Sequence, residues 1–256
     1  MSMSKRVSRI HLVGIGGSGM SGIAEVLLTQ GFVVSGSDAK ASAVTAHLSA
    51  LGAQVSIGHD ARLVQDADVV VASTAIAKDN PELVAARAAR VPVIPRAEML
   101  AEMMRGKFGI AVAGTHGKTT TTTLCALMLE ESGLDPTAHI GAQVSSWNST
   151  GRVGAGSGIF VSEACEYNSS FLRFYSTTAA VLNIDHDHLD CFPTIEDVVD
   201  AFVRFANTLP DGGKLVIPSF DRNMPLFLKL LRKFRRDAGR ERSEEHTSEL
   251  QSRITI

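Results

Sequence analysis

Apolar and polar residues alternate regularly along the first hundred positions, where short β-branched runs are separated by stretches with apolar residues at helical spacing. This order of strand and helix patterns is typical of a parallel α/β sheet. The predicted strands are 9–13, 32–35, 54–57, 68–72 and 91–94, and the predicted helices are 18–29, 43–50, 81–89 and 96–104. Gly31, Gly52 and Gly106 follow three of these helices, at positions where glycine commonly ends a helix. We therefore expect a parallel-sheet α/β domain in residues 1–106.

The pattern begins again after Gly106. A strand at 108–113 leads into a glycine-rich turn and a helix at 118–131. Further strands are predicted at 158–162, 179–184 and 214–217, and a further helix at 196–207. We expect this second α/β domain, residues 107–236, to be incomplete, because no strand pattern follows residue 217.

The C-terminal segment differs from the rest of the chain. Residues 226–236 form an amphipathic, basic helical pattern, which is more typical of a solvated face over a packed one than of membrane or nucleic-acid binding. The tail, 237–256, contains the segment SEEHTSELQS, which resembles the translation of a sequencing adapter, and it has few apolar residues. We expect the tail to be non-native or disordered.

Composition narrows the possible classes of protein. Of the 256 residues, 45% are hydrophobic, which is enough for one or two packed cores and excludes global disorder. The net charge of −2 provides no field that would hold nucleic acid or an anionic membrane, so an anionic ligand must be captured locally. The 3 cysteines form no C-x-x-C pair, and no apolar window approaches the length of a membrane span. We therefore expect a soluble protein of the reducing cytoplasm.

A glycine fingerprint lies between the first predicted strand and the first predicted helix. Gly14, Gly16 and Gly19 have the spacing G-x-G-x-x-G, which allows a tight turn and lets a diphosphate approach backbone N–H groups at a helix N-terminus. Asp38, at the end of the second strand, stands where an acid would meet a ribose hydroxyl. The first domain is therefore expected to be Rossmann-like. Taken alone, these features favour an NAD-dependent oxidoreductase, which stays open as an alternative.

The second glycine-rich turn is a phosphate loop of unusual spacing. Residues 111–123 read AVAGTHGKTTTTT, so a strand, a glycine turn, a Lys-Thr pair and a helix occur in the order that nucleotide binding requires. The general P-loop pattern would place glycine at 112, where this chain has Val112. We expect a P-loop-type ATPase domain in which Lys118 contacts the outer phosphates. His116 either contacts phosphate or maintains the loop.

Acids and histidines follow the next two predicted strands. Glu163 comes directly after the strand at 158–162, and an Asp- and His-rich segment, 185–190, follows the next one. Because groups beyond the carboxyl ends of neighbouring parallel strands converge on one crevice, Thr119, Glu163 and His188 could share metal ions. Glu163 offers the oxygen ligand that Mg²⁺ prefers, whereas His188 is equally compatible with a structural role. Zinc hydrolysis is less favoured, since no third ligand has a standard spacing.

Seven segments together resemble the Mur ligase family, and the resemblance extends over roughly residues 1–235. The segments are GIGGSGMSGIAEVLL (14–28), SGSD (35–38), STAIAKDNPEL (73–83), PRAEMLAEMM (95–104), AGTHGKTTTT (113–122), SEACEYNSSFL (162–172) and NIDHDHLD (183–190). The family's own phosphate loop is of the G-T-x-G-K-T type, which accounts for Val112. Within the family, the chain is most similar to the alanine-adding branch.

The resemblance implies an ATP-dependent, ADP-forming ligase of peptidoglycan precursor synthesis. The γ-phosphoryl group of ATP would move to the lactyl carboxylate of UDP-N-acetylmuramate, and the amino group of L-alanine would then attack the acyl phosphate to form an amide. The implied UDP-sugar-binding residues are Gly14, Gly16, Gly17, Ser18, Gly19, Met20, Asp38 and Ser73. The implied ATP-binding residues are Gly114, Thr115, His116, Gly117, Lys118, Thr119 and Thr120. The implied catalytic residues are Lys118, Glu163 and His188, and the implied Mg²⁺ ligands are Thr119, Glu163 and His188.

One departure from the family leaves other possibilities open. Mur ligases have a third, C-terminal domain that helps to bind the amino acid and closes over ATP, and this sequence ends before such a domain. The chain is therefore expected to bind UDP-N-acetylmuramate without ligating it, either as a fragment of the ligase or as a UDP-sugar-binding module without catalysis. A sister enzyme that attaches a recycled peptide to the same nucleotide sugar is less favoured, because residues 14–28 are more similar to the alanine-adding branch.

Overall fold

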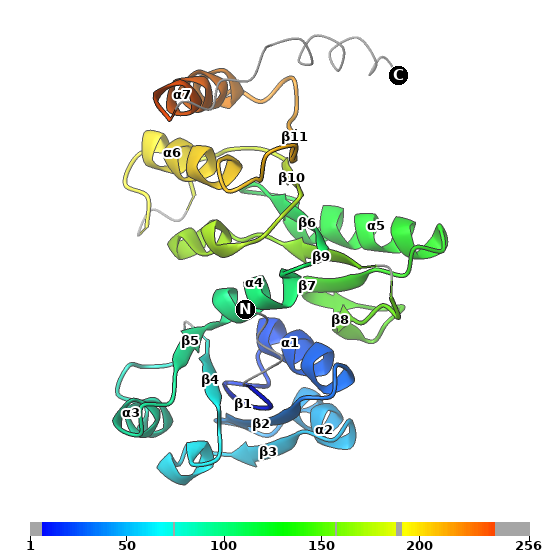
Figure 1. The fold of residues 1–256 in the computed structure, drawn as a ribbon, viewed down its shortest axis with the longest axis vertical. Coiled ribbons are helices and arrows are strands. Elements are labelled where there is room, and N and C mark those ends of the chain that lie inside the picture. The colour runs from blue at the N-terminus through cyan, green and yellow to red at the C-terminus, as the bar shows by residue number, and fades with distance from the viewer. Residues whose placement is uncertain (1–6, 74, 157, 188–190, 239–256) are drawn as a thin grey trace.

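The computed structural model describes residues 7–73, 75–156, 158–187 and 191–238, which fold around two β-sheets (Figure 1). The first sheet has the strand order β3-β2-β1-β4-β5, and all of its strand pairs are parallel. Its strands are β1 (Arg9–Val13), β2 (Val33–Asp38), β3 (Gln54–Ile57), β4 (Val69–Ala72) and β5 (Val93–Pro95). The parallel α/β sheet predicted from the alternating pattern is thereby confirmed.

Helices follow these strands closely along the chain. They are α1 (Ser18–Thr29), α2 (Ala43–Ala50), α3 (Pro81–Ala88) and α4 (Arg96–Met104), with a 3₁₀ turn η2 (Ala61–Val64). Local signals explain where two of them start. The Ser42 side chain accepts a hydrogen bond from the Thr45 backbone N–H in a capping box before α2, and the Asn80 side chain caps α3, which has Pro81 in its first turn.

Strand β2 is longer than the predicted strand at 32–35. It continues to Asp38, and Ser37 pairs with Val13 of β1. Ser37 is fully buried, and its hydroxyl donates a hydrogen bond to the Glu82 carboxylate at 2.8 Å. Because polar residues occupy this buried strand end, a search for apolar runs ends the strand too early.

The second sheet has the order β11-β10-β6-β9-β7-β8. Its strands are β6 (Phe108–Ala113), β7 (Thr137–Val144), β8 (Ser149–Arg152), β9 (Ile159–Glu163), β10 (Thr178–Val181) and β11 (Lys214–Val216). The accompanying helices are α5 (Lys118–Glu131), the 3₁₀ segment η3 (Tyr167–Arg173), α6 (Ile195–Ala206) and α7 (Met224–Asp237). Strands β7 and β8 pair antiparallel while β7 pairs parallel with β9, so this sheet is mixed. The β7–β8 hairpin was not predicted from the sequence.

The last two helices close one face of the second sheet. Phe171 of η3 stacks on Phe205 of α6 with ring centroids 4.6 Å apart and meets Phe202 edge-on at 5.3 Å. The basic helix α7 packs its apolar side, including the buried Phe227 and Leu231, against this layer. Among the helices that the structure describes, none has the length and apolar character required to cross a membrane.

Helix α1 lies between the first sheet and the β7–β8 hairpin (Figure 1). Small residues allow this close approach, since a Cβ on Gly22 would lie 2.7 Å from the Thr150 hydroxyl. The hydroxyls of Ser21 and Thr150 are 3.3 Å apart, and the Ser149 hydroxyl donates to Glu25 at 2.6 Å. The helix that follows the glycine fingerprint is therefore buried on two sides.

The chain passes from one sheet to the other through α4 and Gly106, whose φ is +75°. We propose the boundary between the two domains, 1–106 and 107–236, at this glycine. Of the predicted tail at 237–256, residues 239–256 lie outside the described residues.

Candidate functional site

The glycine fingerprint forms a tight turn that is held by the end of β2. The backbone N–H groups of Gly14 and Ile15 donate to the Ser37 carbonyl at 2.8 and 3.0 Å. Gly14 has a φ of +81°, a backbone conformation that favours glycine. The Gly16 N–H donates to Asp38 Oδ2 at 2.9 Å, so this carboxylate holds the turn.

The N-terminus of α1 presents open donors beside an unpaired cation. Within the described part of the chain, the backbone N–H groups of Ser18 and Gly19 donate no hydrogen bond, and Arg96 makes no hydrogen bond or ion pair. The guanidinium lies across the turn, since a Cβ on Gly19 would be 1.6 Å from Arg96 Nη1. Arg96 is also the first residue of α4, so the positive ends of two helix dipoles and a guanidinium meet here. This arrangement favours an anionic ligand.

Of the other predicted UDP-sugar-binding residues, Ser73 and Gly17 lie at the turn, whereas the Met20 side chain is buried in the core. Ser73 lies close to the turn, with its Cβ 3.8 Å from where a Cβ on Gly14 would be. Gly17 caps α1, and its N–H donates to the Gly14 carbonyl at 3.1 Å. Met20 is not brought to the surface of the turn, because its side chain is 1% exposed within the core and its N–H donates to the Gly17 carbonyl.

A buried histidine on the second sheet also reaches the turn. His139 on β7 lies with Nε2 2.9 Å from the Gly19 carbonyl. Burial lowers the pKa of His139 from 6.5 to about 4, and the positive charge of Arg96 adds to the shift. The imidazole is therefore neutral at pH 7 and donates to the carbonyl through Nε2. The sequence offered no signal for His139, and Arg96 stood in the segment PRAEMLAEMM without a spacing that indicated this role, because both meet the turn only through packing.

The phosphate loop joins β6 to α5 as predicted. Gly114 and Gly117 have φ values of +141° and +81°, and Gly117 caps α5 without a side-chain hydrogen bond, which leaves the first N–H groups of the helix facing the loop. The Lys118 ammonium donates to the carbonyls of Gly114 at 2.6 Å and Thr115 at 3.1 Å. It also forms an ion pair with Glu166, whose carboxylate lies 3.0 Å from Lys118 Nζ. No sequence pattern indicated this role for Glu166.

The segment after β10 forms the floor of this loop. The Asn183 side chain accepts from the His116 N–H at 2.8 Å and donates to the His116 carbonyl at 3.0 Å. The Asp185 N–H donates to the buried Thr115 hydroxyl at 2.8 Å. The backbone of His116 therefore maintains the loop, while its exposed side chain lines the neighbouring cavity. Asn183 stood in the segment NIDHDHLD, but its spacing carried no signal for this role.

Thr119 and Glu163, two of the three predicted metal ligands, lie together. The Thr119 hydroxyl donates to Glu163 Oε2 at 2.9 Å, and the same oxygen accepts the Gly141 N–H from β7 at 3.2 Å. A hydroxyl and a carboxylate are the oxygen ligands that Mg²⁺ prefers, so this pair fits the ion. Among the described residues, no group of three or more His, Cys, Asp or Glu side chains is placed so that it could hold a metal ion. The third predicted ligand, His188, lies outside the described residues.

A cavity of about 320 Å³ joins these groups. Its lining residues are Thr115, His116, Gly117, Lys118, Thr119, Thr120 and Glu163. Most of the predicted ATP-binding residues and the predicted metal-binding acid Glu163 therefore line one cavity. The volume of this cavity suits part of a nucleotide.

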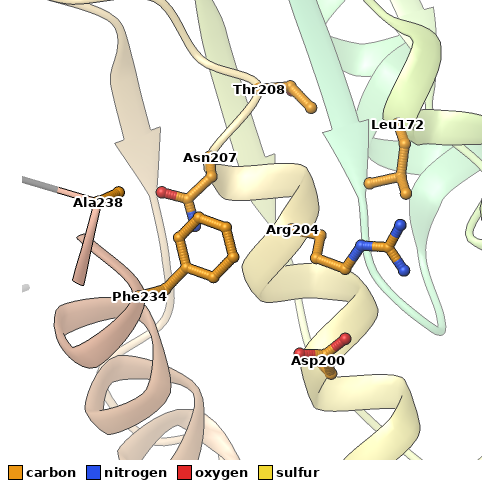
Figure 2. Close-up of a pocket in the computed structure, with 7 residues that line it drawn as sticks. All are labelled: Leu172, Asp200, Arg204, Asn207, Thr208, Phe234 and Ala238. Atoms are coloured by element: carbon orange, nitrogen blue, oxygen red, sulfur yellow. The ribbon is translucent and has the colours of Figure 1, made fainter. Parts of the chain in front are cut away.

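A wider groove lies elsewhere, between α6 and α7, with a volume of about 760 Å³ (Figure 2). Figure 2 shows Asp200 and Arg204 on α6 and Phe234 on the facing helix α7. None of the predicted site residues lines this groove. The candidate functional site is therefore the phosphate loop together with the glycine turn.

Comparisons with known proteins identify the family to which this fold and sequence belong. Residues 9–108 match the family model described as Mur ligase family, catalytic domain, and residues 112–251 match the Mur ligase middle domain. A UDP-N-acetylmuramate–L-alanine ligase of Geotalea daltonii is 50% identical over 231 residues, which is 90% of this chain and 50% of that protein. Another, from Syntrophus aciditrophicus, is 54% identical over 84% of this chain and 45% of its own length. The chain thus spans about half the length of the curated relatives it matches.

Solved structures of Mur ligases share this architecture, and two of them illustrate the similarity. The UDP-N-acetylmuramate:L-alanyl-γ-D-glutamyl-meso-diaminopimelate ligase of Neisseria meningitides has a TM-score of 0.81 and 30% identity, over 88% of this chain and 75% of that one. The UDP-N-acetylmuramate-alanine ligase of Thermotoga maritima has a TM-score of 0.75 and 30% identity, over 86% and 51%. The fold, the phosphate loop and the matches to both family models lead to one conclusion: this chain belongs to the Mur ligase family.

Proposed function

We propose that this chain supplies the UDP-N-acetylmuramate and ATP sites of a ligase that joins L-alanine to the lactyl carboxylate of the nucleotide sugar. The observation that carries the proposal is that strand β7 connects two helix N-termini whose geometry suits anions, the glycine turn before α1 and the phosphate loop before α5. The glycine turn meets His139, and two residues further along β7 the Gly141 N–H meets Glu163. The relatives that are 50% and 54% identical carry the name UDP-N-acetylmuramate–L-alanine ligase.

The phosphate loop and Glu163 would have distinct parts in this chemistry. The N–H groups at the start of α5 would bind phosphate oxygens, and the Lys118 ammonium would neutralise charge on the γ-phosphoryl group as it moves to the carboxylate. Thr119 and Glu163 would hold Mg²⁺, which supplies positive charge to the phosphates when bound. The amide would form when the amino group of L-alanine attacks the acyl phosphate and releases phosphate.

The NAD-dependent oxidoreductase is less well supported. Its argument depended on Asp38 as an acceptor for a ribose hydroxyl, and Asp38 Oδ2 accepts the Gly16 N–H instead. The alternative of a UDP-sugar-binding module without catalysis leaves the phosphate loop and the Thr119–Glu163 pair without a use. Two structural neighbours favour the recycling sister enzyme, whereas the sequence relatives at 50% identity or more favour L-alanine as the second substrate.

Calorimetric titration of the 256-residue chain tests the proposal directly. We expect saturable binding of UDP-N-acetylmuramate and of ATP in the presence of Mg²⁺, and no binding of NADH. Tighter binding of NADH than of the nucleotide sugar would contradict the proposal and restore the oxidoreductase.

Replacing Arg96 by alanine should weaken binding of UDP-N-acetylmuramate by roughly tenfold or more, because a hydrogen bond to a charged group contributes about 1.5–3 kcal/mol. Parallel titrations with uridine, which lacks the diphosphate, should show equal affinity for the parent and the variant. Arg62→Ala is a matched control, since Arg62 is exposed and pairs with Asp60 away from the turn. Equal affinities of parent and Arg96→Ala for the nucleotide sugar would remove Arg96 from the diphosphate site.

Replacing Glu163 by glutamine should raise the Mg²⁺ concentration needed for half-maximal ATP binding by at least about tenfold, because the charged oxygen ligand is lost. The measurement is a series of ATP titrations at increasing Mg²⁺. Glu131→Gln, an exposed acid at the far end of α5, should leave the Mg²⁺ dependence as it is. Identical Mg²⁺ titrations for Glu163→Gln and the parent would show that Glu163 does not bind the metal.

A further inference from the structure

The ammonium of Lys118 is fully engaged by the protein itself. An ammonium has three N–H donors, and Lys118 Nζ has three acceptor groups within 3.2 Å: the carbonyls of Gly114 and Thr115 and the carboxylate of Glu166. A nucleotide phosphate therefore gains this cation only if one of the three contacts is given up.

Of the three groups that contact the Lys118 ammonium, only Glu166 is both charged and buried, so it is the one that would compete with a phosphate for this ammonium. Its two oxygens are 3.2 and 3.0 Å from Lys118 Nζ, and its side chain is 2% exposed, against 12% for Lys118. In such surroundings an ion pair is screened little by solvent. The two loop carbonyls are neutral and lie on the loop itself, so they can stay with the ammonium when a phosphate arrives.

The two acids of the segment Glu163–Glu166 face different partners. Glu163 lines the 320 Å³ cavity and accepts from Thr119, whereas Glu166 does not line it and faces Lys118. Lys118 therefore stands between the cavity and Glu166. Its four-carbon stem allows the ammonium to turn from the carboxylate toward the cavity while the carboxylate stays in place.

The backbone around Glu166 is held firmly. The residues that follow, Asn168 and Ser169, both have left-handed φ values, +51° and +52°, a conformation that side chains rarely adopt unless neighbours maintain it. The Ser169 N–H donates to the Glu166 carbonyl at 2.8 Å, and the Phe171 N–H donates to the Cys165 carbonyl at 3.1 Å. Because Phe171 stacks in the core, Glu166 is presented from a rigid support.

We propose that Glu166 is a positioning residue that competes with phosphate for Lys118: it holds the ammonium in the empty loop, and a bound nucleoside triphosphate takes the ammonium from it. This inference rests on the proposed ATP site. As a consequence, the Glu166 carboxylate neutralises the Lys118 ammonium in the empty loop. Only a ligand with several negative charges within reach of Lys118 is then bound tightly.

The test is the affinity of Glu166→Gln for MgATP and for inorganic tripolyphosphate, measured by calorimetry on the full chain. Removing a negative charge near the phosphates and freeing Lys118 act in the same direction, so we expect both ligands to bind about threefold to tenfold more tightly than to the parent. Adenosine, which has no phosphate, should bind equally to both. A residue that only maintained the loop would give weaker or unchanged binding, and either result would overturn the inference.

Two further variants keep the test decisive. Glu166→Asp keeps the charge but shortens its reach, so its affinity should lie between those of the parent and Glu166→Gln, and it serves if the glutamine variant folds poorly. Glu131→Gln removes an acid from the exposed end of α5 and should not increase affinity. If parent and variants all fail to bind both phosphate ligands, the proposed ATP site is itself wrong. Binding by the parent without a gain in either Glu166 variant overturns only the role of Glu166.

Discussion

Lys118→Ala is expected to lose most of the affinity for MgATP. The variant removes the only side-chain cation that lines the described cavity, and a charge-assisted contact to phosphate contributes about 1.5–3 kcal/mol, a loss of at least about tenfold in affinity. Calorimetry with MgATP on the full chain measures the effect. Affinity equal to that of the parent would show that the loop does not hold the nucleotide.

The same substitution should also destabilise the fold. Glu166, at 2% exposure, would lose its lysine partner, and removing one partner of a buried ion pair costs about 3–5 kcal/mol. The double variant Lys118→Met/Glu166→Gln should recover much of the free energy of unfolding without recovering nucleotide binding. Urea denaturation of the single and double variants separates the two effects. Equal unfolding free energies for the parent and Lys118→Ala would contradict the ion pair's role in stability.

The second large effect is a loss of stability in acid that depends on His139. Burial lowers the pKa of His139 from 6.5 to about 4, so between these values the unfolded chain binds a proton that the folded chain does not. Stability therefore rises with pH across this window and falls as the pH decreases from 6.5 to 4. A shift of this size corresponds to a loss of about 3 kcal/mol once the pH is below 4.

A variant that cannot titrate isolates this contribution from that of other groups. His139→Gln keeps an amide donor for the Gly19 carbonyl, so it should lose less unfolding free energy than the parent between pH 7 and pH 4.5, as measured by urea denaturation. His47→Gln is the control, because it makes the same substitution at a histidine that is 43% exposed rather than buried. Parallel pH profiles for the parent and His139→Gln would rule out a buried neutral histidine at this position.

Helix and strand limits that depend on neighbouring residues were predicted well from the sequence. Helices α1 and α5 begin and end at the predicted residues because a glycine turn precedes each and the apolar pattern of each is local. The same holds for β6, whose residues are all apolar, and for β1, in which the apolar residues Ile10, Leu12 and Val13 are buried. The positions of the glycine turn and the phosphate loop follow from these limits, because each lies where a strand meets a helix.

The contacts that shape the two sites depended on the tertiary structure. The strand β8, with the sequence STGR, has no apolar residue, and it is buried because the small residues of α1 pack on it. Arg96, His139 and Glu166 reach the turn or the loop from distant parts of the chain.

The sequence by itself therefore determined the α/β class, the family, and the positions of the two glycine-rich motifs and of Glu163 at the end of a strand, because each follows from the order or spacing of nearby residues. Only the tertiary structure decided which cation lies over Gly19, which acid holds Lys118 and which strand joins the two sites. Packing brings Glu166 to Lys118 and His139 to Gly19 within hydrogen-bond distance, across 48 and 120 residues of sequence, and no local sequence pattern predicts contacts over such separations.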